Sequence, residues 1–207
     1  MLIPSVRRSF SFLLFLLLSI SSAWRTVTAQ TLKNFEGAVS VFGQSTGTIN
    51  ANGVRDHPTE SMGGLATVRQ SFHFWLGYEV NYSYTRFTER FSTIPFGVQN
   101  NVHEVSVAYL LQGPTLPILG LQPFATVGTG ALIFLPTSVG GQGYPKQTRV
   151  PVLYEVGVNH PVFTSHLGLR FQYRGLLYKT PDFNATLLTT NTRRQTSELS
   201  LGAYFKF

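Results

Sequence analysis

The chain ends in the segment TSELSLGAYFKF, residues 196–207. Every second side chain is apolar in this segment, and the positions between them are polar or small; the apolar set is Leu199, Leu201, Ala203, Phe205 and Phe207. A period of two residues is the pattern of a β-strand with one apolar face. Chain termini are usually polar and poorly ordered, so a chain that closes on such a strand is unusual. The segment therefore predicts a strand whose apolar face is covered by a protein core or by lipid.

Seven further segments have the composition of strands. With the last one, the predicted strands are 35–43, 63–71, 74–87, 102–111, 122–134, 150–159, 166–179 and 196–207. Most have about the 9–11 residues with which a tilted strand crosses the hydrocarbon layer of a membrane. Charged residues make up only 12% of the chain. Its many Gly, Thr, Ser, Tyr and Phe residues favour strands and turns over helices.

The predicted connections differ in length in a regular way. Long connections are expected at 44–62, 88–101, 135–149 and 180–195, and shorter ones at 72–73, 112–121 and 161–165. Outer-membrane barrels have an even number of strands, short periplasmic turns and longer extracellular loops. With a periplasmic N-terminus, all four long connections would lie outside the cell.

These features resemble the OmpA/OmpX-like superfamily of eight-stranded outer-membrane β-barrels. The resemblance implies an all-β fold, a transmembrane up-and-down antiparallel barrel with meander topology. It also implies that Phe205 and Phe207 belong to the C-terminal signal recognised by the barrel assembly machinery. Because the sequence ends at Phe207, a periplasmic peptidoglycan-binding domain such as that of OmpA is not expected. A soluble exported β-sandwich or lipocalin-like barrel is the alternative, and the terminal Phe207 and the tyrosines of 74–87 favour the membrane.

The N-terminus has the pattern of a secretory signal peptide. Arg7 and Arg8 precede an apolar run at 9–23, and small residues allow cleavage after Ala23 or Ala29. The predicted organisation is a signal peptide at 1–29 and a barrel domain at 30–207. Of the 16 basic residues, cleavage after Ala29 removes three, so 13 remain against nine acidic residues and the net charge is +4. Such a chain is expected in the outer membrane, and nucleic acid is a poor candidate partner.

Charged residues fall on the strand faces opposite the apolar ones. They predict a charge network inside the barrel that consists of Glu36, Arg69, Glu79, Glu104, Glu155, Arg170, Arg174, Glu198 and Lys206. An eight-stranded barrel is just wide enough for side chains to fill it, so these charges need partners. The predicted turn at 161–164 would place Glu155 opposite Arg170. Two more pairs are expected, Arg174 with Glu198 and Glu36 with Lys206.

The interior network allows two interpretations. It can be a polar plug that fills the barrel and fixes its register, or a gate in which ion pairs exchange partners. The first implies a structural, adhesive or surface-interaction role, with an unknown ligand of the four long loops. The second implies a narrow channel for ions or small solutes.

Basic residues near the outer ends of the strands suggest contacts with the membrane surface. Arg86 and Arg90 are candidate partners of lipopolysaccharide phosphates, which suit guanidinium groups. Solvated loop charge is the simpler interpretation of each. The expected partners are outer-membrane lipids, lipopolysaccharide and the assembly machinery, with the protein as a monomer.

No catalytic, cofactor or metal site is predicted. Some eight-stranded barrels modify lipid A and need serine, histidine and an acid near the outer surface. Asp56, His57 and Ser61 share a loop, but three polar residues in one loop are common by chance, so an enzyme is not expected. His103 is expected on the lipid side. The chain contains no cysteine.

Overall fold

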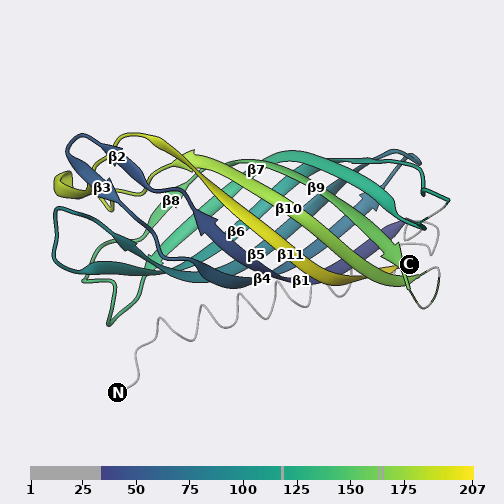
Figure 1. The fold of residues 1–207 in the computed structure, drawn as a ribbon, viewed down its shortest axis with the longest axis horizontal. Coiled ribbons are helices and arrows are strands. Elements are labelled where there is room, and N and C mark those ends of the chain that lie inside the picture. The colour runs from purple at the N-terminus through teal and green to yellow at the C-terminus, as the bar shows by residue number, and fades with distance from the viewer. Residues whose placement is uncertain (1–33, 118, 163, 165) are drawn as a thin grey trace, which may run out of the picture. The chain divides into compact units, whose positions relative to one another are not determined.

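Eight long antiparallel strands close into a barrel in the computed structural model, which describes residues 34–117, 119–162, 164 and 166–207 (Figure 1). The strands are β1 (Phe35–Thr46), β4 (Ser61–Ser71), β5 (Leu76–Arg90), β6 (Gly97–Gln112), β7 (Gln122–Pro136), β9 (Val152–Pro161), β10 (Leu167–Lys179) and β11 (Arg193–Lys206). All eight predicted strands are therefore confirmed. The predicted signal peptide, 1–29, lies outside the described residues.

The strands pair in chain order, and the pairing of the first strand with the last closes the ring. β6 pairs with β7, and the first strand β1 pairs with the last strand β11 from Glu36 opposite Lys206 to Thr46 opposite Thr196. Figure 1 shows β1 beside the yellow β11 along the barrel wall. The up-and-down meander topology is confirmed.

The strands extend further than predicted on the side of the long connections. β5 continues to Arg90 and β6 begins at Gly97, so the expected loop at 88–101 is mostly strand. The other long connections contain β2 (Ile49–Ala51), β3 (Val54–Asp56), β8 (Gln147–Arg149) and the 3₁₀ helix η1 (Thr186–Leu188). We call this side of the barrel the loop end, the folded connections on it the cap, and the opposite side the turn end.

The outer wall between the two ends is apolar. Val39 is 67% exposed and Val41 63%, and apolar side chains of the other strands continue this belt around the barrel. Monomeric soluble proteins rarely expose apolar patches of this extent, whereas transmembrane barrels carry such a band against lipid. No helix among the described residues is long and apolar enough to span a membrane.

The interior consists of two layers, one mainly charged and one mainly apolar. The half near the turn end holds the charged side chains, as expected. The half near the loop end is an apolar core formed by Val54, Phe87, Phe91, Val98, Val102, Leu132, Phe134, Leu153, Leu176, Tyr178, Phe183 and Leu188. Expecting a polar interior throughout was wrong for this half, because the loops fold inward and need an apolar surface to pack on.

Four aromatic rings lie across glycines on neighbouring strands, three of them inside the narrow barrel and one, Tyr154, on its outer wall. Phe42 is paired with Gly63, Phe124 with Gly157, Tyr154 with Gly175 and Tyr204 with Gly168. Such a pairing of aromatic residues with glycines is a recognised way to stabilise strongly curved sheets.

We predict that Gly63→Ala destabilises the barrel by about 1–3 kcal/mol, the usual cost of overpacking. A Cβ at Gly63 would overlap the Phe42 ring and lie 2.5 Å from the carbonyl oxygen of Tyr84. Urea unfolding in detergent micelles measures the loss. Gly64→Ala is the control, because a Cβ there meets no atom within 4 Å. Equal stability of the two variants would contradict the predicted packing.

Candidate functional site

The structure places the nine side chains of the predicted network on the inner wall of the barrel, from its middle to the turn end. Eight of them are buried, and the Lys206 side chain is 33% exposed. Two of the arginines, Arg69 and Arg174, each contact several carboxylates from other strands. These contacts organise the site.

Arg69 on β4 joins β5 and β9. Its Nε donates to Glu79 Oε2 at 2.7 Å, and its Nη2 donates to Glu155 Oε1 at 3.0 Å. Its guanidinium carbon lies 3.9 Å from the centroid of the Phe124 ring, within cation–π range. Asn81 Nδ2 donates a further bond to Glu79 Oε1 at 2.7 Å. Both oxygens of this deeply buried carboxylate are therefore satisfied.

Arg174 on β10 contacts three carboxylates. Nη1 donates to Glu198 Oε2 at 2.6 Å, Nη2 to Glu104 Oε1 at 2.7 Å, and Nε to Glu155 Oε2 at 3.1 Å. Glu155 therefore bridges Arg174 and Arg69. The bridge makes one continuous network across the barrel, because β10 and β4 are not neighbouring strands.

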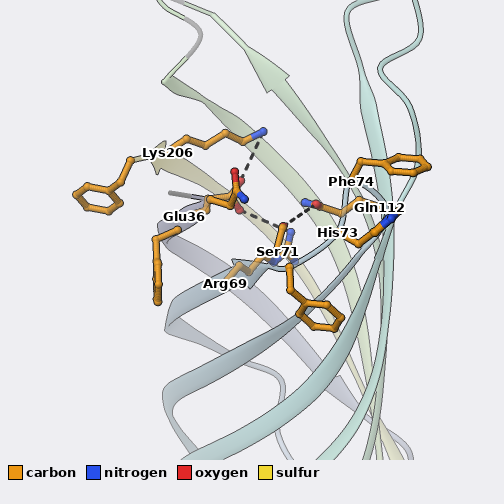
Figure 2. A pocket seen from close by; sticks show the side chains of 11 residues that line it. Glu36, Arg69, Ser71, His73, Phe74, Gln112 and Lys206 are labelled. Atoms are coloured by element: carbon orange, nitrogen blue, oxygen red, sulfur yellow. Dashed lines mark hydrogen bonds and ion pairs between the residues drawn. The ribbon is translucent and has the colours of Figure 1, made fainter. Parts of the chain in front are cut away.

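A second group of charges lies closer to the opening at the turn end. Arg170 Nη2 donates to Glu36 Oε1, and Arg170 Nε donates to Asn159 Oδ1 at 2.9 Å. Lys206 Nζ donates to Gln122 Oε1 at 3.0 Å and lies 3.8 Å from Glu36 Oε2. Figure 2 shows Glu36, Arg69 and Lys206 pointing toward this opening.

One of the three expected pairs is wrong. Arg174 is opposite Glu198, and Glu36 is opposite Lys206, as predicted. Arg170, however, is opposite Asn159, and Glu155 is opposite Arg174. β9 continues to Pro161, which is opposite Gly168, so the turn is later in the chain than predicted and the register shifts by four residues. A register shift by an even number of residues leaves the same side chains inside the barrel. The alternation of inward and outward faces therefore did not reveal this shift.

A second ion cluster, which the sequence did not indicate, lies in the cap. Arg194 Nη1 donates to Asp56 Oδ2 at 2.8 Å, and Arg194 Nη2 donates to Glu89 Oε1. All three residues are buried. We call them the cap triad, which joins the β2–β3 hairpin to the ends of β5 and β11. Continuing the alternation of Glu79 along β5 to Glu89 would have placed Glu89 inside, but Asp56 had no such signal.

The cap triad has two carboxylates and one base. Burial raises the pKa of Asp56 to about 9; the neighbouring Glu89 carboxylate adds to this effect and Arg194 opposes it. Asp56 therefore holds a proton at neutral pH. Because this pKa lies above its ordinary value of 3.8, the contribution of Asp56 to stability is complete below about pH 4 and is lost as the pH rises toward 9.

The three residues considered for catalysis do not converge. Asp56 faces inward to Arg194, whereas His57 is exposed and its Nδ1 lies 2.7 Å from Thr48 Oγ1. Ser61 Oγ lies 3.0 Å from Thr85 Oγ1. His103 is on the outer wall, with its Nδ1 2.8 Å from the Tyr82 hydroxyl. Among the described residues, no three His, Asp or Glu side chains form a group that could hold a metal ion.

The outer surface of the loop end is basic. Arg86 and Arg90, the candidate lipopolysaccharide contacts, are both exposed on β5. Exposed bases of the same end also include Arg55, Lys146, Lys179 and Arg193. Among the described acidic residues, only Glu60 is exposed, since Asp182 is partly buried against Arg149 at 3.1 Å and the other seven are buried.

No protein-family model matches the chain, and no curated protein sequence matches it. Solved structures of outer-membrane barrels do match. Neisserial surface protein A is 14% identical, with 84% of this chain and 98% of that chain covered and a TM-score of 0.59. OprG of Pseudomonas aeruginosa is 11% identical, with 84% and 96% covered and a TM-score of 0.58. At these identities the likeness shows the fold, an eight-stranded outer-membrane β-barrel.

We predict that Arg174→Met destabilises the barrel by at least about 3–5 kcal/mol, because it leaves buried carboxylates without their base. The change in gel mobility on heating and urea unfolding both measure the loss. Arg193→Met is the control, since Arg193 is exposed at the start of the neighbouring strand β11. A loss below about 1 kcal/mol, typical of surface ion pairs, would show that the network contributes little.

We predict that Asp56→Asn flattens the pH dependence of cap stability between about pH 6 and 9, because the amide resembles the protonated acid. Hydrogen exchange of the β2–β3 amides across this range measures it. Asp182→Asn is the control: burial raises the pKa of Asp182, but a hydrogen bond from Gln147 and other interactions outweigh this and lower it. A wild-type cap with constant stability over this range would contradict the prediction.

Proposed function

We propose that this protein is a bacterial outer-membrane protein whose packed barrel is a membrane anchor and whose basic loop end binds phosphate groups of lipopolysaccharide. The role is structural and surface-interacting. The observation that carries the proposal is the separation of charge, with carboxylates buried inside the barrel and bases exposed outside at the loop end. The following contacts support it.

Aromatic side chains mark the two edges of the apolar belt. Near the turn end, Phe74 is 83% exposed and Tyr109 70% exposed. Near the loop end, the belt carries outward tyrosines on several strands, which are Tyr82, Tyr84, Tyr154 and Tyr173. Such girdles lie at the two interfaces of a bilayer. Short periplasmic turns and longer extracellular loops then orient the loop end toward the outside.

Arg86 is positioned at the outer girdle. Its Nε donates to Asn101 Oδ1 at 2.7 Å, and the Tyr84 hydroxyl donates to the same oxygen at 3.1 Å. This contact holds the guanidinium through Nε and leaves its two terminal nitrogens to form a fork toward a ligand. A fork of this kind binds phosphate oxygens in a bidentate manner. Arg90 lies four residues further out on the same face of β5, which is two repeats of the strand period.

Among the described residues, the other exposed bases of the loop end form no ion pair within 4 Å, although Lys179 lies near enough to Asp182 to lower the pKa of that carboxyl. Lys179 on β10 is directly opposite Arg193 on β11, and both side chains are exposed. Like charges directly opposite each other on neighbouring strands repel. A bound anion relieves this repulsion, which supports an anionic partner at the cell surface.

A narrow channel is the second candidate function, suggested by the polar opening at the turn end. The apolar layer in the loop half supports the filled anchor instead, because Phe134, Leu153 and Leu188 have no exposed surface. A liposome-swelling assay with the refolded protein separates the two candidates. If the barrel is a filled anchor, liposomes that contain it swell at the same rate as liposomes without protein. A faster swelling rate favours the channel.

We predict that Arg86→Ala with Arg90→Ala weakens binding to purified lipopolysaccharide about tenfold, because two charge-assisted contacts are lost. Surface plasmon resonance measures the affinity, and binding of the wild-type protein should weaken at high salt. Thr88→Ala, between the two arginines on β5, is the control without a change of charge. If the wild-type protein bound dephosphorylated lipopolysaccharide as tightly as it binds phosphorylated lipopolysaccharide, the proposal would be contradicted.

A further inference from the structure

The turn end opens into a cavity of about 550 Å³ for which the proposed function has no use (Figure 2). We call it the vestibule. Phenylalanine rings surround its rim, and polar and charged side chains lie deeper. The lining includes Glu36, Arg69, Ser71, Gln112 and Lys206.

Two deeply buried atoms at the vestibule have no hydrogen-bond partner among the described residues. They are Arg69 Nη1, a donor, and Glu36 Oε2, an acceptor. The two side chains are 1% and 6% exposed, and Arg69 Nη1 lies 3.8 Å from Glu36 Oε1, beyond hydrogen-bond reach. Buried polar groups are nearly always satisfied, so this donor and acceptor indicate that a small polar molecule belongs beside them.

A third group faces the same space. Ser71 Oγ donates to Gln112 Oε1 at 3.0 Å, which fixes the amide of Gln112 and leaves its Nε2 as a donor. Figure 2 shows Gln112 and Ser71 across the opening from Lys206. The vestibule therefore offers two donors, Arg69 Nη1 and Gln112 Nε2, and one carboxylate oxygen.

The charges around the vestibule restrict the ligand. Three acids, Glu36, Glu79 and Glu155, contact the bases of this half, which are Arg69, Arg170 and Lys206. These three acids and three bases are part of the larger network, because Glu155 also pairs with Arg174. A ligand with a net charge would add a further buried charge to this network. A ligand that carries one positive and one negative group adds no net charge.

We propose that the vestibule binds small zwitterions of the α-amino-acid type. The ligand carboxylate accepts hydrogen bonds from Arg69 Nη1 and Gln112 Nε2. The ligand ammonium donates to Glu36 Oε2. The donor and the acceptor belong to side chains 3.8 Å apart, so one small molecule reaches both.

Titration of isotope-labelled full-length protein in detergent with glycine tests the proposal, with the Gln112 side-chain amide as the NMR reporter. Glycine has few atoms, so a Kd of about 1 mM is expected. Acetate and ethylammonium, which each carry one of the two charges, should bind at least about tenfold more weakly. Equal binding of acetate overturns the zwitterion site in favour of an anion site. No shift up to about 50 mM glycine also overturns the proposal, and the vestibule then holds water alone.

Two variants assign the contacts. Glu36→Gln removes the ammonium acceptor and should weaken glycine binding at least about tenfold, with an amide on β1 as reporter. Because Glu36 also binds Arg170, Gln112→Ala provides a test with less risk to folding. It should weaken binding about threefold to tenfold, with the same β1 amide as reporter because the Gln112 side-chain amide is absent. Tyr109→Ala is the control, since Tyr109 lies on the same strand and faces outward. Unchanged affinity in both variants overturns the assignment.

Discussion

The structure depends on the pairing of Arg174 and Arg69 with four carboxylates inside a barrel too narrow to hydrate them. Glu155 bridges the two bases, and Glu79, Glu104 and Glu198 complete the contacts. An isolated charge at this depth would be very costly. Because the partners come from β4, β5, β6, β9, β10 and β11, the network forms only when the ring is closed in one register. Charge pairing and barrel closure are therefore one requirement.

The cap also contains buried ion pairs, and there they hold the connections of the loop end in place. The loop half of the barrel contains an apolar core, to which the connections contribute Val54, Phe91, Phe183 and Leu188. The cap triad ties the β2–β3 hairpin to this core through Arg194. Loops on a barrel are usually mobile, but connections with their own core form an ordered surface. That surface can hold bases at fixed positions.

Burying acids has a consequence for the outside of the molecule. Seven of the nine acidic residues lie in the interior or the cap triad, so the exposed bases of the loop end have few internal partners. Arg86 is oriented by Asn101 and Tyr84 at the level of the outer girdle. The same partition of charge that closes the barrel thus creates a surface suited to anionic groups. At the turn end, acids and bases are buried side by side, which favours a ligand without net charge.

The amino-acid sequence by itself determined the eight strands, their inward and outward faces, and which charges lie inside. These features follow from a period of two residues, which is local to each strand. Only the tertiary structure decided the register of β9 with β10, because a shift by four residues leaves every face unchanged and depends on where the turn begins. It also decided that an apolar core fills the loop half of the barrel, since the cap residues that complete this core come from distant connections. The hairpin at Asn52 and Gly53, both with positive φ, had a local turn signal. The placement of Asp56 beside Arg194 had no local sequence signal. The two residues are 138 positions apart, and only closure of the barrel brings them together.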